Sequence, residues 1–85
     1  MNEMTPPSNA KLIWNCRRGM LELDILLSRF VTKQITILND RQRYLFARLL
    51  DCADPDLFAY LMGQAVPDDQ ELMEIVTYIH AHDSV

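Results

Sequence analysis

The sequence predicts an all-α fold, a compact single-domain bundle of about five short helices. Apolar residues recur every three or four positions in several segments, which is the spacing of one buried helix face. Helix start and stop signals separate these segments. The 85 residues include 49% hydrophobic residues but only 2 Gly and 4 Pro, which is typical of one folded domain. We expect a leader at residues 1–8, a helical domain at residues 9–82 and a tail at residues 83–85.

The first helix is expected to follow the pair Pro6-Pro7, which does not fit inside a helix. Ser8 or Asn9 is its expected cap, and its length is about nine residues. Trp14 fits either the edge of the core or a recognition surface. The apolar face of this helix is predicted to comprise Leu12, Ile13 and Cys16.

Gly19 is the predicted junction of the first two helices, because glycine adopts a positive φ that other residues resist. Arg17 and Arg18 are then expected to close the first helix, and Glu22 to open the second. Each such charge suits the helix dipole, by about 0.3–1 kcal/mol where it is exposed. Ordinary helix stability is therefore an alternative to a functional role for all three charges.

The second predicted helix has the longest apolar periodicity of the chain. Residues 32–38 have high β-propensity, but a single strand has no sheet to join, so we expect a helix end and a connection there. The face expected to be solvated carries Glu22, Arg29 and Lys33. The face predicted to be buried comprises Met20, Leu23, Leu27, Phe30 and Val31.

A third helix is predicted to start at Asn39, because Gln42 lies three residues later and completes an approximate capping box. Asp54 is the expected N-cap of a fourth helix. Pro55 then occupies its first position, where the missing N–H has no cost. Gly63 is expected to end this helix.

The last helix is predicted to begin at Pro67 and Asp68, with Glu71 three residues after Asp68. Apolar residues recur at helical spacing in all three of these later helices. The predicted core positions are Leu45, Phe46, Leu49, Leu50, Leu57, Phe58, Leu61, Met62, Leu72, Ile75, Val76 and Ile79.

Charge is distributed unevenly along the chain. Residues 1–50 hold all eight basic residues and four acids, a balance of +4, whereas residues 51–85 hold eight acids and no Lys or Arg, a balance of −8. Such a separation would orient the domain toward a partner. It argues against nucleic acid, because the positive charge is dispersed and offset. Membrane insertion is not expected either, since no apolar segment is long enough to span a bilayer.

Catalytic and metal-ligating patterns are sparse. Cys16 and Cys52 lack CxxC spacing, and no secretory leader is recognised, so we expect reduced core thiols in a cytoplasmic protein. His80 and His82 are two positions apart, do not face each other on a helix, and suit a helix C-terminus. We predict no catalytic residue, no bound metal and no cofactor of the protein's own. An independent thiol or metal enzyme is the alternative.

Two blocks of the sequence resemble a known family. Residues 14–24 read WNCRRGMLELD and contain R-G-x-x-E at Arg18, Gly19 and Glu22, and residues 49–61 read LLDCADPDLFAYL. In this order, they resemble the signature blocks of the succinate dehydrogenase flavinylation factors, which are small FAD assembly factors. The resemblance covers residues 9–80. Tyr60 is a departure, because family members often carry Trp there, but an aromatic ring is kept.

The resemblance implies a helical assembly chaperone that is not itself an enzyme. It would bind the flavoprotein subunit of succinate dehydrogenase, and that of fumarate reductase, and promote covalent attachment of the client's FAD to a client histidine. Glu22 would accept from a client donor or hold Arg18, and the free protein would be a monomer. Bacterial members also resemble proteins once labelled antitoxins of a membrane-associated toxin, so an antitoxin-like regulator is the alternative. The expected partner-binding residues are Arg18, Gly19, Glu22, Arg17, Trp14 and Asp24.

Overall fold

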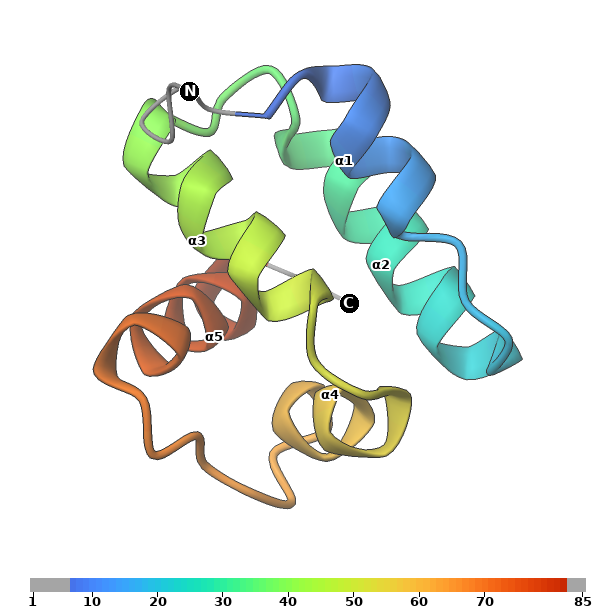
Figure 1. The fold of residues 1–85 in the computed structure, drawn as a ribbon, viewed down its shortest axis with the longest axis vertical. Coiled ribbons are helices and arrows are strands. Elements are labelled where there is room, and N and C mark those ends of the chain that lie inside the picture. Colours follow the sequence, from blue (N-terminus) through green and yellow to red (C-terminus); the bar gives the residue numbers. More distant parts are fainter. Residues whose placement is uncertain (1–6, 83–85) are drawn as a thin grey trace.

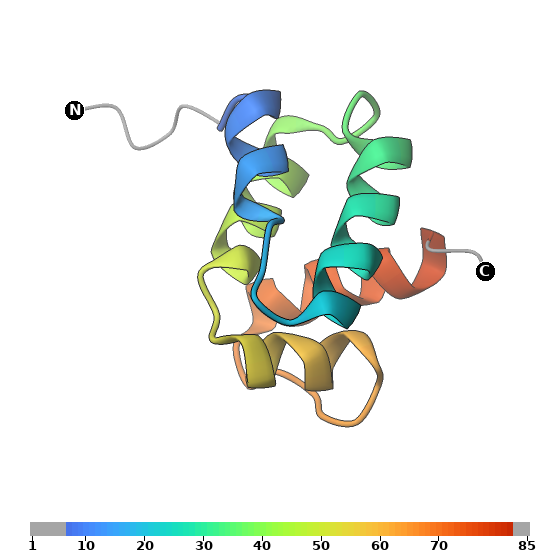
Figure 2. The ribbon, with the colours of Figure 1, turned by 90° about the vertical axis from the view of Figure 1, so that its right-hand side faces the viewer.

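The computed structural model describes residues 7–82, which form five α-helices and no strand (Figure 1). The all-α prediction is therefore confirmed. In Figure 2, α1, α2 and α3 run alongside one another, and α4 and α5 lie across their lower end. Most of the predicted leader and the whole predicted tail lie outside the described residues. The helices are α1 (Asn9–Asn15), α2 (Leu21–Gln34), α3 (Asp40–Leu50), α4 (Asp54–Leu61) and α5 (Gln70–His82).

One hydrophobic core joins all five helices. The ring of Phe30 on α2 lies 5.4 Å from that of Phe46 on α3, and it meets Tyr78 of α5 edge-on at 6.3 Å. The predicted core faces of α2, α3 and α5 are confirmed, with Met20 and Leu72 at the margin. The buried apolar residues are Leu12, Cys16, Leu23, Leu27, Phe30, Val31, Ile35, Leu38, Leu45, Phe46, Leu49, Leu50, Leu57, Ile75, Val76 and Ile79.

Two predicted core residues are exposed instead. Ile13 is 47% exposed, because it follows buried Leu12 directly and so lies about 100° around α1 from it. Met62 is 50% exposed, because α4 ends at Leu61 and Met62 already belongs to the turn that follows. Periodicity alone places both near an apolar stripe, and only the packing shows that they fall at its edge.

Local capping signals define most helix starts. The Ser8 side chain accepts from Lys11 N at 3.2 Å. The capping box of Asn39 and Gln42 is confirmed, with hydrogen bonds of 2.8 and 2.9 Å. At α5 the prediction was one residue early, because Asp69, not Asp68, accepts from the first backbone N–H groups of the helix, at 2.8 and 3.1 Å.

The junction between α1 and α2 differs from the prediction. Arg17 and Arg18 do not close α1, because Cys16 N donates to Ile13 O at 3.2 Å and ends the helix in a tight turn. Gly19 does not have a positive φ. Among the described residues that conformation belongs to Gly63, with φ of 75°, which follows α4 as predicted.

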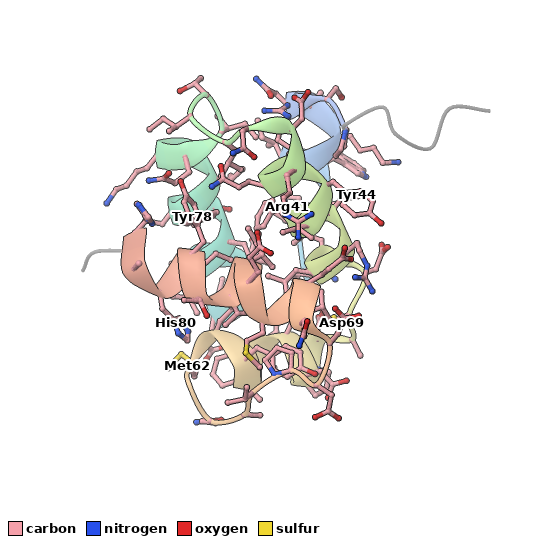
Figure 3. The ribbon with its side chains drawn as sticks, turned by 90° about the vertical axis from the view of Figure 1, so that its left-hand side faces the viewer. Arg41, Tyr44, Met62, Asp69, Tyr78 and His80 are labelled. Atoms are coloured by element: carbon pink, nitrogen blue, oxygen red, sulfur yellow. The ribbon has the colours of Figure 1, made fainter. Side chains whose placement is uncertain are left out.

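Some basic residues of the first half of the chain form ion pairs with acids of the second half within the fold. Arg41 points from α3 toward α5 (Figure 3) and holds Glu74 through two hydrogen bonds of 2.9 and 3.0 Å. Arg48 binds Glu71 and also Asp69, the latter at 3.0 Å, and this contact keeps the pKa of Asp69 below its ordinary value. Basic residues of the first half therefore dock α3 onto the acidic start of α5.

Candidate functional site

The connection between α1 and α2 lies beside the turn between α3 and α4, as Figure 2 shows. A surface pocket of about 300 Å³ opens between them. The residues that line it are Trp14, Asn15, Arg17, Arg18, Leu50 and Asp51. Three of the six predicted partner-binding residues thus come together at one pocket, which we call the junction pocket.

Arg18 lines this pocket but is largely buried, with only 15% of its side chain exposed. Its Nη2 donates to the carbonyl oxygen of Leu50, the last residue of α3. A helix leaves its final carbonyls without intrahelical donors, and a cation there also suits the helix dipole. The Nη1 of Arg18 donates to Asp54 Oδ1 at 3.3 Å. The guanidinium therefore holds the α1–α2 connection against the α3–α4 turn.

Asp54 does not have its predicted role as N-cap of α4. Ala53 occupies the cap position and makes no side-chain hydrogen bond, while Asp54 is the first helical residue. Pro55 lies in the first turn of the helix, where its missing N–H has no cost. The carboxylate of Asp54 turns to Arg18 instead, and 31% of its side chain is exposed. Sequence reasoning assigned Arg18 no acid other than Glu22, whereas the bound acid is Asp54.

Two polar atoms beneath the connection are buried without a hydrogen-bond partner among the described residues: Arg18 Nε and Asp24 Oδ1. Asp24 lies in the first turn of α2 and is half-buried, so it is more enclosed than the rim contact that was predicted. Cys16 lies within electrostatic reach of both charges. Burial raises the pKa of its thiol from 9.0 to about 11, while Arg18 lowers that pKa and Asp24 raises it.

The remaining predicted site residues are exposed. Trp14 has 72% of its surface exposed, although an aromatic ring of this size is usually at least half buried. Arg17 and Glu22 are also exposed, on the connection and on the first turn of α2. Gly19 has no atom within 4 Å of the place that a Cβ would take, so its bare backbone faces open space.

Two apolar residues that sequence reasoning missed lie next to this group. Leu21 and Ile25 are exposed on the first turns of α2, one helical turn apart. Their spacing is the only signal that the sequence contains for them. Asn15, Leu50 and Asp51 were also missed as pocket residues. The second resembling block, residues 49–61, contained the last two, but nothing in it indicated contact with Arg18.

The raised pKa of Cys16 has a testable consequence for stability. An unfolded chain releases the thiol proton near pH 9, whereas the folded chain keeps it to about pH 11, so the folded state is favoured below pH 9 and this advantage is lost as the pH rises to 11. We expect the free energy of unfolding to fall by on the order of 2 kcal/mol more in the wild type than in Cys16→Ala across that range. Denaturant titrations at each pH measure this difference. Equal slopes for the two proteins would contradict it.

Other reactive groups show no catalytic arrangement within the described part of the chain. Cys16 and Cys52 are free thiols, and burial raises the pKa of both, which opposes nucleophilic reactivity. His80 and His82 contact backbone oxygens of Leu61 and Tyr78. The described residues contain no cluster of three potential metal ligands. Among them, no helix has the length and apolar character to cross a membrane.

Comparison with known proteins gives consistent results. A family model described as "Flavinator of succinate dehydrogenase" matches residues 10–83. The FAD assembly factor SdhE of Shewanella oneidensis is 49% identical over 70 residues, covering 82% of this chain and 85% of the relative. The same factor of Legionella pneumophila is 47% identical over 74 residues, covering 87% and 92%. That of Idiomarina loihiensis is 46% identical over 69 residues, covering 81% and 77%.

Proposed function

Because the chain belongs to the family of flavinators of succinate dehydrogenase, we propose that it is an assembly chaperone for the flavoprotein subunit of that enzyme. It binds this subunit, and that of fumarate reductase, and promotes covalent attachment of FAD to a client histidine. The names of its relatives, FAD assembly factors, support this function.

The observation that carries the proposal is the exposed surface around the junction pocket. Trp14 and Arg17 stand out from it, and side chains of these two types dominate the energetics of many protein interfaces. Gly19 leaves room for a client backbone to approach closely. Leu21 and Ile25 add apolar area on the next turns of α2. The surface therefore combines two large side chains that can anchor a partner, an unobstructed backbone at Gly19 and exposed apolar area on α2.

The covalent chemistry belongs to the client and its flavin. The chaperone has no FAD of its own and contributes by binding the client conformation in which the histidine nitrogen meets the flavin. A partner that favours one conformation shifts the population toward it. Correct orientation of two reacting groups alone removes a large part of a reaction barrier.

The chaperone acts in the cytoplasm and is a monomer when it is free. Two unpaired cysteines suit a reducing compartment. Arg17 lines the junction pocket, and Glu22 lies on the first turn of α2; both are exposed. Charged side chains at such positions steer the approach of a partner.

Covalent flavin on the flavoprotein subunit tests this function directly. It is measured as in-gel flavin fluorescence under denaturing conditions, in cells that lack the gene and in cells in which the gene is restored. We expect loss of the signal on deletion and full recovery on restoration, at equal amounts of client protein. Unchanged fluorescence, with affinity capture of a membrane-associated toxin instead of a flavoprotein, would overturn the proposal in favour of the antitoxin-like alternative.

A further inference from the structure

Asp54 uses its carboxylate in an unexpected way. An acid at the N-cap position normally accepts from N–H groups of the first helical turn, but Asp54 is the first helical residue of α4 and lies one position after the cap. Here no side chain caps α4, and the carboxylate of Asp54 binds Arg18, which is 36 positions away in the sequence. The α4 helix thus begins without a side-chain cap, and the carboxylate of its first residue contacts the α1–α2 connection.

The guanidinium of Arg18 depends on few contacts for its orientation. Nη2 is held by the carbonyl of Leu50 and Nη1 by Asp54, while Nε is buried without an acceptor among the described residues. Two anchors from different sides define the plane of a guanidinium, whereas one anchor leaves it free to rotate. Asp24, on the first turn of α2, also has a buried carboxylate oxygen without a hydrogen-bond partner among the described residues.

The backbone of the connection has one hydrogen bond of its own among the described residues, from Arg17 N to Trp14 O at 3.1 Å, which ties it only to the end of α1. Arg17 and Arg18 lie in no helix, and Gly19 has no side chain to pack. The Arg18 side chain is therefore the tie between this backbone and the α3–α4 turn. It also joins two segments that line the junction pocket, since the lining residues include Trp14 of α1 and Leu50 of α3.

We propose that Asp54 is a positioning residue for the client-binding surface: together with the Leu50 carbonyl it locks Arg18 in place and so fixes the shape of the Arg17–Gly19 connection. The effect of Asp54 on client binding rests on the proposed function, whereas its contact with Arg18 does not depend on that function. A surface that is already in its binding shape loses less conformational entropy on association. Asp54 thereby sets client affinity without lining the junction pocket.

The test compares Asp54→Asn with Asp56→Asn, which removes an acid from the same first turn but is exposed and makes no contact with Arg18 in the described structure. We expect Asp54→Asn to weaken binding of the purified flavoprotein subunit about tenfold, and Asp56→Asn to change it by less than about twofold. Asp54→Glu keeps the carboxylate and is expected to restore most of the affinity. In an Arg18→Met background, Asp54→Asn is expected to have almost no additional effect.

A second measurement uses the free protein and needs no client. Amide resonances of residues 17–20, and the Nε–H resonance of Arg18, are expected to shift in Asp54→Asn and to stay in place in Asp56→Asn. Equal affinities for the Asn variants, or weaker binding with unshifted resonances, would overturn the inference. Failure of the proposed function appears differently, as wild-type protein that does not bind the flavoprotein subunit while the resonances still respond to Asp54→Asn. Should Asp54→Asn not fold, Asp54→Ser takes its place in both measurements, because serine also lacks the carboxylate that binds Arg18.

Discussion

Replacing Glu22 with alanine is expected to abolish covalent flavin attachment to the flavoprotein subunit while leaving the fold nearly unchanged. Glu22 is exposed in the first turn of α2, and the acid that holds Arg18 is Asp54, so no described contact of the fold depends on Glu22. An exposed carboxylate in a first turn stabilises a helix by less than about 1 kcal/mol. In-gel flavin fluorescence measures the attachment, and denaturant unfolding measures the stability.

Asp40→Ala is the matched control for Glu22→Ala. Asp40 is also an exposed acid in the first turn of a helix, but that helix is α3, away from the R-G-x-x-E segment. The two substitutions remove the same charge from the same kind of position, so they have similar effects on the free energy of unfolding. Flavin attachment is expected to survive Asp40→Ala. Wild-type attachment by Glu22→Ala would remove Glu22 from the mechanism.

The largest expected effect on stability is that of Phe46→Ala. Phe46 is completely buried in α3, and its ring packs on Phe30 of α2. Removing a buried Phe side chain costs about 3–5 kcal/mol, because apolar contacts are lost and a cavity remains. A domain of this length has a total stability of roughly 4–13 kcal/mol, so Phe46→Ala removes a large fraction of it. Equilibrium unfolding in urea measures the loss.

Tyr44→Ala serves as the control for Phe46→Ala, because Tyr44 is an exposed aromatic on the same helix. It is expected to change stability by about 1 kcal/mol or less. In cells, Phe46→Ala should reduce flavin attachment together with the amount of this protein, whereas Glu22→Ala should reduce attachment at normal abundance. A Phe46→Ala protein as stable as Tyr44→Ala would contradict the packing described for the core.

Most of the fold was predictable because its signals are local. Apolar spacing defines the buried faces of α2, α3 and α5, and the capping box of Asn39 and Gln42 involves residues three apart. One kind of wrong prediction concerns a choice between near-equivalent neighbours. Asp68 and Asp69 are chemically identical, and contact with Arg48 on α3 accompanies the use of Asp69.

The junction pocket shows the limit of local signals more clearly. The resemblance predicts Arg18, Gly19 and Glu22 as a functional segment, but two of the residues that line the pocket with Arg18, Leu50 and Asp51, come from the end of α3 and the turn after it. Expecting a positive φ at Gly19 was also wrong, since the tight turn at Cys16 had already redirected the chain. What the structure shows at Gly19 is open space around the place of a Cβ, and the arrangement of the neighbouring segments determines that space.

The sequence by itself determined the helical architecture, the buried faces and the segment that carries the family motif, because each depends on residues within a few positions of one another. Only the tertiary structure decided which acid forms an ion pair with Arg18. Glu22 is four positions away and Asp54 is 36, yet the docking of the α3–α4 turn beside the α1–α2 connection brings Asp54 within 3.3 Å of the guanidinium. A side chain's partner is set by distance in space, and packing of the whole core determines that distance.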